Sequence, residues 1–485
     1  MSKKNQNYTN RKQNRFQPER MRENVFLNNS GKQWLPGANG RAAKVERLLR
    51  GAKEEKKEIA GNMAGYKDSG VEEVKFIPKD WNTLRMKDAF NISKEIIGDK
   101  WTEAALLSLT TNGVKSITAD EQVGKRPKTF ATYQRVTKND IVMCLFDLDA
   151  SAVFSGLSGY DGMISPAYKI LKTKEQVLPE FANYYFQYIF EGRKYKKYAK
   201  SIRYTLSGEE FLRLLIVVPP LPEQQRIADF LDTKCGIIDR TIDAVSRQIE
   251  DLEKYKKALI TKTVTKGICK KGEPERAMKD SGVEWIGEDI PFDWDINRLQ
   301  FCIDEISERN YTGKETQILS LMKDKGVIPY EEKGKVGNIS KTDLTQYKLA
   351  YPNTLITNSM NIIIGSSGIS QYKGCVSPAY YIFKAKPNND IRYFNYIFAV
   401  RAFQNECRRF ANGILEIRLR ISSTNLLKIK VHVPPLAEQQ QIADYLDEKC
   451  KNIDNRVQKR RQQLEWLKEY KKSLIFDYVT GKKRV

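Results

Sequence analysis

The chain has 485 residues, which is enough for two or three domains, and 40% of them are hydrophobic, which is enough for real cores. Its formal net charge of +23 favours a polyanionic partner, with nucleic acid ahead of an anionic membrane surface. No run of 18 apolar residues, no apolar leader and no paired cysteine spacing occurs, so a membrane span, a secreted disulfide frame and a zinc site are not expected. We expect a cytoplasmic protein with reduced thiols.

The first element in chain order is a basic N-terminal extension, residues 1–66. Its first 50 residues hold 12 basic and 3 acidic residues. We expect disorder over most of this segment, with one possible amphipathic helix at 41–59. It is either an additional nonspecific DNA contact or a solvated tail.

Residues 67–221 follow as a first mixed α/β domain, with short β-rich runs, Gly- and Asn-containing turns and one aromatic helical stretch at 181–190. Residues 222–266 are predicted to form a long helix, which begins after a Pro-Pro pair. Residues 267–436 repeat the domain pattern, with their aromatic stretch at 391–400. Residues 437–485 are predicted to form a second long helix and a basic tail.

An internal repeat explains this order. Residues 219–265 and 434–480 align without a gap, with 25 identities in 47 positions. The sequence KDSGVE occurs at 67–72 and at 279–284, and SPAY occurs at 165–168 and at 377–380. A duplication followed by divergence accounts for this ordered set.

Both long helices carry an apolar seam with alternating spacings of three and four residues, the pattern of a coiled coil. The seam residues are Ile238, Ile242, Val245, Ile249, Leu252, Leu259, Ile453, Val457, Leu464, Leu467 and Leu474. Because a domain separates the helices in sequence, an antiparallel pair is easy to close. The alternative is that each helix packs only on its own domain. The predicted fold class is α+β: two mixed α/β domains separated by two long antiparallel coiled-coil helices, with a pseudo-twofold internal repeat.

The sequence lacks the motifs of catalysis. His432 is the only histidine, no phosphate-binding P-loop is present, and the Asn/Asp-Pro-Pro-aromatic motif of an amino-methyltransferase is absent. Asp232-x-Lys234 and Asp447-x-Lys449 resemble part of a nuclease motif, but we interpret them as solvated helix charges. We therefore expect a non-catalytic reader of double-stranded DNA that binds no cofactor.

Lys and Arg side chains are expected to contact phosphates, and a few side chains are expected to contact base edges. The SPAY segments are interpreted as turns with a buried aromatic residue. The candidate DNA-binding residues, in clusters at matched positions of the two repeats, are Lys115, Lys125, Arg126, Lys128, Arg193, Lys194, Lys196, Lys197, Arg203, Tyr204, Lys323, Lys325, Lys333, Lys335, Arg408, Arg409, Arg418 and Arg420.

The order of a variable domain, a helix that opens with PPLxEQQxIAxxLD, a second variable domain entered through KDSGVEWIG, and a second such helix resembles the specificity subunits of Type I restriction–modification enzymes. The resemblance covers residues 67–485. It implies two target recognition domains that read a split, asymmetric site, and conserved spacer helices that dock two methyltransferase subunits. It also implies adenine-N6 methylation with S-adenosylmethionine, and cleavage by two ATP- and magnesium-dependent translocase–nuclease subunits. Those cofactors belong to the partner subunits.

Three other interpretations remain open from the sequence. The chain is equally compatible with a specificity module of a stand-alone methyltransferase without a nuclease. A basic coiled-coil scaffold for acidic proteins or RNA would show no DNA sequence preference. A magnesium-dependent nuclease would use Asp232 and Asp447.

Overall fold

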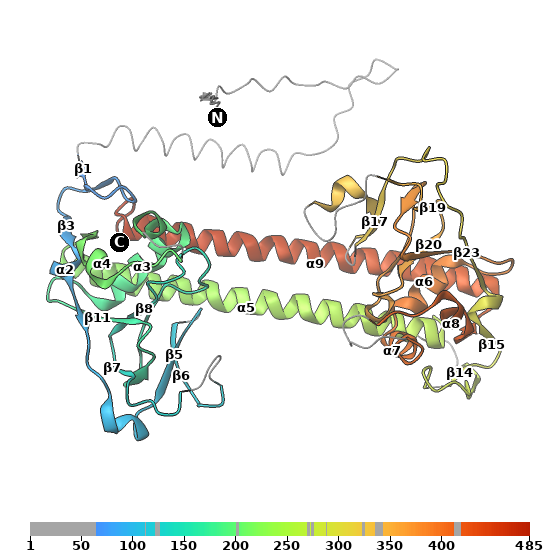
Figure 1. The fold of residues 1–485 in the computed structure, drawn as a ribbon, viewed down its shortest axis with the longest axis horizontal. Helices are drawn as coiled ribbons and strands as arrows, with labels where there is room; N and C mark the ends of the chain where they lie inside the picture. The colour runs from blue at the N-terminus through green and yellow to red at the C-terminus, as the bar shows by residue number, and fades with distance from the viewer. Residues whose placement is uncertain are drawn as a thin grey trace, which may run out of the picture.

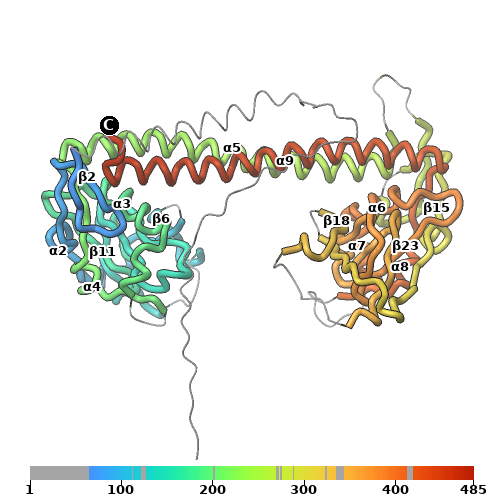
Figure 2. Tube along the Cα trace, turned by 90° about the horizontal axis from the view of Figure 1, so that it is seen from above, coloured from blue at the N-terminus to red at the C-terminus, as the bar shows by residue number. Residues whose placement is uncertain are grey.

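The computed structural model describes residues 65–111, 113–121, 127–199, 203–268, 272, 276–287, 289–322, 325–334, 343–411 and 419–485. Two globular domains lie at opposite ends of a pair of long helices (Figure 1). The described residues before the first long helix build domain 1, and those between the two long helices build domain 2. Seen from above, both domains project from the same side of the helix pair and stand apart from each other (Figure 2). The predicted fold class is confirmed.

The two long helices, which we call the spacer helices, are α5 (Leu221–Lys266) and α9 (Leu436–Val479). Each begins directly after a Pro-Pro pair, and each has an acidic residue in its first turn, where the helix dipole favours negative charge. At 1.5 Å per residue, a helix of this length spans roughly 65–70 Å. The predicted boundaries, 222–266 and the start at 437, differ from the observed ones by a single residue at each N-terminus.

Ion pairs show that the spacer helices are antiparallel. Lys471 contacts Asp239 at 2.7 Å near domain 1, and Lys256 contacts Asp454 at 2.7 Å near domain 2. The residue number therefore rises along α5 while it falls along the adjacent stretch of α9, as in an antiparallel pair. The eleven predicted seam residues are all buried or half-buried. The helices therefore pack along an apolar seam that charged residues interrupt at Lys256, Arg460 and Lys471, and this pairing holds the two domains apart.

Domain 1 contains two four-stranded sheets, with strand orders β6-β5-β10-β7 and β4-β11-β8-β9, and smaller strand pairs β1-β2 and β3-β12. Its strands are β1 (Tyr66–Asp68), β2 (Phe76–Pro78), β3 (Asn82–Arg85), β4 (Phe90–Ser93), β5 (Leu106–Thr110), β6 (Gly113–Ile117), β7 (Gln134–Val136), β8 (Ile141–Met143), β9 (Ser155–Leu157), β10 (Gly162–Ile164), β11 (Lys169–Thr173) and β12 (Leu215–Val218). Its helices are α2 (Met86–Ala89), η2 (Gly98–Thr102), α3 (Pro179–Glu191), η3 (Lys194–Tyr198) and α4 (Gly208–Arg213).

Domain 2 repeats this plan. Its four-stranded sheet has the order β16-β23-β20-β21, which matches β4-β11-β8-β9, and β15 pairs with β24 as β3 pairs with β12. Its strands are β13 (Met278–Lys279), β14 (Ile290–Pro291), β15 (Asp295–Arg298), β16 (Ile303–Glu305), β17 (Leu319–Met322), β18 (Gly326–Pro329), β19 (Lys348–Ala350), β20 (Leu355–Asn358), β21 (Ser367–Ile369), β22 (Gly374–Val376), β23 (Tyr380–Ala385) and β24 (Lys430–Val433). Its helices are η4 (Leu299–Phe301), η5 (Tyr330–Lys333), η6 (Ile362–Ile364), α6 (Ile391–Ala399), α7 (Arg401–Arg409) and α8 (Ser423–Lys428).

The core of each domain includes both spacer helices. In domain 1, Leu231 of α5 and Val479 of α9 are fully buried against the aromatic residues of α3. In domain 2, Val264 of α5 and Leu446 of α9 are fully buried in the same way. Fully burying such a side chain contributes about 1.5–3 kcal/mol. Each spacer helix thus packs on both domains at its ends and on the other helix between them, which combines the two packing modes considered from the sequence.

Candidate nucleic-acid interface

The first glutamine of each EQQ motif joins a domain to its spacer helix. The backbone N–H of Leu178 donates to Oε1 of Gln224 at 2.8 Å, and Nε2 of Gln224 donates to the carbonyl oxygen of Pro219 at 2.9 Å. In domain 2, the backbone N–H of Asp390 donates to Gln439 at 2.9 Å, and Gln439 donates to Pro434 at 2.8 Å. Both glutamine side chains are fully buried. The start of the aromatic helix in each domain is therefore fixed to the start of a spacer helix.

The tyrosines of the aromatic helices contact the spacer helices about two turns further along. Tyr184 donates to Asp232 at 2.6 Å, and Tyr396 donates to Asp447 at 2.6 Å. Burial, followed by these hydrogen bonds to a carboxylate, raises the pKa of both tyrosines. Both aspartates are exposed, as predicted for solvated helix charges, and each one also accepts a hydrogen bond that anchors a domain.

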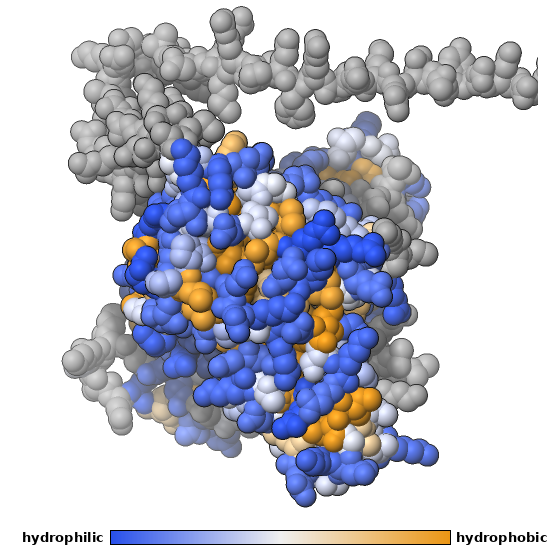
Figure 3. All heavy atoms as spheres, turned by 90° about the vertical axis from the view of Figure 1, so that its left-hand side faces the viewer, coloured by the Kyte–Doolittle hydropathy of each residue, from blue (hydrophilic) through white to orange (hydrophobic). Residues whose placement is uncertain are grey.

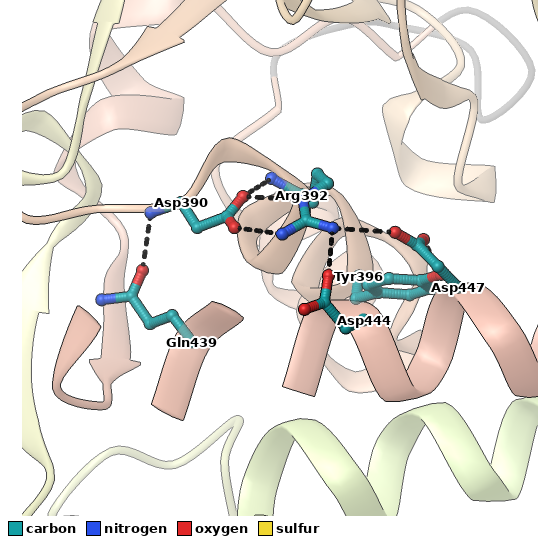
Figure 4. Close-up of polar contacts among 6 residues, drawn as sticks. All are labelled: Asp390, Arg392, Tyr396, Gln439, Asp444 and Asp447. Atoms are coloured by element: carbon teal, nitrogen blue, oxygen red, sulfur yellow. Dashed lines mark hydrogen bonds and ion pairs between the residues drawn. The ribbon is translucent and has the colours of Figure 1, made fainter. Parts of the chain in front are cut away.

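An arginine strengthens this anchor in domain 2 alone. Arg392 of α6 contacts Asp390 at 2.7 Å, Asp444 at 2.6 Å and Asp447 at 3.2 Å (Figure 4). These carboxylates raise the pKa of the Arg392 guanidinium, with the hydrogen bond to Asp390 as the largest cause. In α3 the matching position holds Glu180. This position therefore carries a charged anchor in domain 2 only, whereas α3 of domain 1 has an ion pair with α9 elsewhere, between Glu191 and Lys472 at 3.0 Å.

The rigid attachment leaves the β-hairpins of the two domains on facing sides. Figure 2 shows β6 and β18 on the sides of domains 1 and 2 that look toward each other. Lys115 lies on β6 and Lys325 directly precedes β18, and both side chains are exposed. These two predicted DNA-binding residues are thus placed on the facing sides, at the end of a fixed spacer. Lys128 is also exposed.

The predicted basic cluster 193–204 of domain 1 is occupied by contacts within the domain. Arg193 donates to the carbonyl oxygen of Ser151 at 2.7 Å, and Lys197 contacts Glu73 at 2.8 Å. Lys196 lies 3.9 Å from Asp149 and 4.1 Å from the ring centre of Tyr204. Lys194 lies over the ring of Tyr188, and burial lowers its pKa. Arg203 is exposed.

The candidate DNA-binding residues of domain 2 likewise include some that contact other side chains of the domain and some that are exposed. Arg409 contacts Glu284 at 2.6 Å, and Lys333 lies 4.8 Å from the ring centre of Tyr330. Arg408 and Arg420 are exposed. The predicted extension 1–66 with its helix 41–59 falls outside the described residues except for its last two positions, and so do Lys125, Arg126, Lys323, Lys335 and Arg418.

The SPAY segments form turns, as the sequence indicates. The backbone N–H of Tyr168 donates to Ser165 at 3.2 Å, and that of Tyr380 donates to Ser377 at 3.0 Å. Both tyrosine side chains are half-buried, and the Tyr168 ring packs on Phe146. The SPAY segments therefore have a structural role, as turns with a half-buried tyrosine.

At the outer end of domain 1, the residues that the structure describes form no extended apolar surface. Figure 3 shows this face, where hydrophilic side chains dominate and hydrophobic ones lie between them in separate small groups. Among the described residues, no helix combines the length and the apolar character that a membrane crossing needs, and no cluster of three metal-binding side chains occurs.

Sequence reasoning missed several anchoring residues. Trp81 donates to Glu223 at 3.1 Å, and Trp294 donates to Glu438 at 2.9 Å. The sequence signal for these contacts was the duplication of the Asp-Trp and EQQ motifs. One Asp-Trp motif precedes each domain and one EQQ motif follows it, and this repeated arrangement indicates a contact between the two motifs. The role of Arg392 had no such signal, because it occurs in one repeat only.

The chain matches the model of the Type I restriction modification DNA specificity domain twice, over residues 78–254 and 298–465. It is 26% identical to the Type I restriction enzyme MjaVIII specificity subunit of Methanocaldococcus jannaschii, over 87% of this chain and 98% of that protein. A chain from a structural study of type I R-M system assembly and conformational transition aligns with a TM-score of 0.60 at 14% identity, over 84% of this chain and 99% of that one. The HsdS subunit from Thermoanaerobacter tengcongensis aligns over 84% of this chain and 98% of its own, at 15% identity and a TM-score of 0.45. The two family matches together span most of the chain, which belongs to the Type I restriction–modification DNA specificity family.

Proposed function

We propose that this chain reads a bipartite, asymmetric DNA site, with domain 1 on one half-site and domain 2 on the other. The observation that carries the proposal is the placement of two equivalent domains on one side of a fixed spacer. Half-sites one duplex turn apart lie ~34 Å from each other on the same face of the DNA. A spacer helix of about 65–70 Å is long enough to hold both domains at such a separation.

In this proposal the chain itself performs no catalysis. Two methyltransferase subunits bind it and methylate adenine at N6 with S-adenosylmethionine. Two translocase–nuclease subunits, which use ATP and magnesium, join them in the cytoplasm to cleave unmodified DNA. The family membership supports DNA and restriction–modification subunits as partners, and the number of each subunit is part of the proposal.

Exchange of one domain tests the division of labour. Replacing 73–218 with the equivalent segment of another specificity subunit should change one half-site and leave the other half-site as it was. Mapping methylated adenines in a host with and without the exchanged gene gives the readout. A change in both half-sites, or in neither, would refute the proposal that each domain reads its own half.

Shortening the spacer tests its role as a ruler. Deleting one heptad from each spacer helix at the same level between the domains should shorten the gap between the recognised half-sites. The seam register survives such a paired deletion, because seven residues restore the same helix face. An unchanged gap between methylated half-sites would show that the helices do not set the distance.

A further inference from the structure

The spacer has two long faces that differ in chemistry. Asp239, Glu253 and Asp454 each directly follow a seam residue, and Arg461 follows Arg460, which occupies the next heptad position after Val457, so all four lie on the same face of the antiparallel pair. Ion pairs confirm this, since Arg461 contacts Glu253 at 2.8 Å across the two helices. We call this side the domain face, because Lys472, which follows Lys471 at the heptad position between Leu467 and Leu474, contacts Glu191 of α3 at 3.0 Å.

The residues that directly precede the heptad positions of the seam, including the positions held by Lys256 and Lys471, lie on the opposite side, which we call the outer face. It carries four large exposed apolar side chains: Ile237 (48% exposed), Tyr255 (58%), Trp466 (62%) and Tyr470 (46%). The rings of Trp466 and Tyr470 stack, with centres 5.4 Å apart and planes 2° from parallel. Figure 2 shows both domains on one side of the helix pair, so the outer face points away from them. Exposed aromatic groups of this kind mark interaction sites.

The outer face is not equal in its two halves. In the internal repeat, Trp466 corresponds to Asp251, Tyr470 to Tyr255 and Ile237 to Asn452. Because the helices are antiparallel, the ion pair Lys471–Asp239 brings Tyr470 level with the turn of α5 that holds Ile237. Ile237, Trp466 and Tyr470 therefore gather in the half next to domain 1. The half next to domain 2 has only Tyr255, flanked by Asp251 and Asn452.

We propose that two copies of the methyltransferase subunit dock on the two halves of the outer face with unequal affinity, and that the half next to domain 1 binds first. This rests on the proposed function for the identity of the partner. Trp466 is the residue that makes the first site tight, and Asp251 makes the second site weak, because a carboxylate at that position must lose its hydration when an apolar segment covers it.

The charges along the edge of the outer face indicate the chemistry of the docking segment. Arg240, Arg247 and Lys254 are exposed at seven-residue spacing along α5, so they form one basic ridge beside the apolar residues. The matching ridge of α9 is Asn455, Gln462 and Glu469, which suits a protein partner better than a phosphate backbone. The docking segment that complements this surface therefore has an apolar stripe and acidic residues on the side toward α5.

A titration of the full chain with the methyltransferase subunit encoded with it tests the inference. Native mass spectrometry and sedimentation should show two binding steps with distinct dissociation constants. Trp466→Asp should raise the first constant by about tenfold or more, the effect of removing an aromatic hot spot, and leave the second unchanged. Asp251→Trp should tighten the second step toward the first.

Controls separate binding from folding. Trp466 is mostly exposed, so Trp466→Asp should leave the thermal midpoint unchanged, and Glu465→Gln, on the other side of α9, should change neither step. Equal constants in the unaltered chain, or a first step that Trp466→Asp does not weaken, would overturn the inference while the proposed function stood. If removal of residues 1–64 made both methyltransferase copies bind equally, those residues would be the occupant of the outer face, and the inference would be overturned as well. Failure to form any complex would overturn the proposed function and, with it, this inference.

Discussion

The indole nitrogen of Trp294 donates a hydrogen bond of 2.9 Å to Glu438, which lies in the first turn of α9. Trp294 is fully buried, and the same carboxylate accepts from Arg276 at 2.9 Å. In domain 1, Trp81 and Glu223 repeat the contact at 3.1 Å, and Arg484 from the tail after α9 lies 3.5 Å from Glu223. In each domain, a tryptophan near the start of the domain thus contacts the first turn of the spacer helix that follows. Arg276, which follows α5, contacts the start of α9, and Arg484, which follows α9, contacts the start of α5.

Removing the charge at this junction should loosen domain 2. Glu438→Gln keeps an acceptor for Trp294 but weakens the contacts with Arg276, whose pKa is raised chiefly by the hydrogen bond to Glu438. We expect a loss of about 1–2 kcal/mol in the free energy of unfolding, measured by urea denaturation. Glu448→Gln, at a side chain that is 68% exposed, should change it by less than about 0.5 kcal/mol. Equal effects of the two variants would contradict the structural role of Glu438.

The tyrosine–aspartate pairs should matter for stability and not for chemistry. Tyr396→Phe and Tyr184→Phe each remove one hydrogen bond to a carboxylate, which should cost about 1–2 kcal/mol in thermal or urea unfolding. Asp232→Ala and Asp447→Ala should lower the thermal midpoint in the same way. The purified chain should not cut DNA in magnesium before or after these changes. Cleavage that disappears in either aspartate variant would restore the nuclease interpretation.

His432 should make the stability of domain 2 depend on pH. It is fully buried, its Nδ1 lies 2.6 Å from the Tyr393 hydroxyl, and burial lowers its pKa to about 3. The unfolded chain, with an ordinary pKa near 6.5, binds a proton that the folded chain excludes, so stability is full above that pH and falls as pH decreases.

Replacing the histidine should remove this dependence. Val217 occupies the equivalent strand position in domain 1, so His432→Val suits the site, and Tyr393 keeps its acceptor on Val264 at 3.2 Å. At pH 5 we expect the unaltered chain to have lost about 2 kcal/mol relative to pH 7.5, a loss that the variant escapes. Parallel stability curves for the two proteins between pH 4.5 and 7.5, from urea unfolding, would show that His432 is not the source.

The candidate DNA contacts should fall into two groups. Lys115→Ala and Lys325→Ala, on the facing hairpins, should each weaken DNA binding and lower the slope of log affinity against log salt by about 1. Lys197→Ala and Arg409→Ala should leave the slope unchanged, because both side chains already contact carboxylates. Fluorescence anisotropy on a duplex with the mapped site gives the slopes. A larger effect of Lys197→Ala than of Lys115→Ala would reverse this grouping.

The sequence by itself determined the architecture: the duplication, the two seams from Ile238 to Leu259 and from Ile453 to Leu474, and the starts of the long helices at the Pro-Pro pairs. These features are local and periodic, and a 3.5-residue repeat can be recognised without knowing which residues lie close together in the fold. Tertiary structure alone decided which charges are engaged. Lys197 and Lys115 look alike in sequence, yet one lies against Glu73 and the other is exposed on β6. The partners of Trp294 and Asp447 lie over a hundred and about fifty positions away in the sequence, respectively. Such contacts, like the partner of a surface charge, form only when the chain folds, and a local periodic pattern does not predict them.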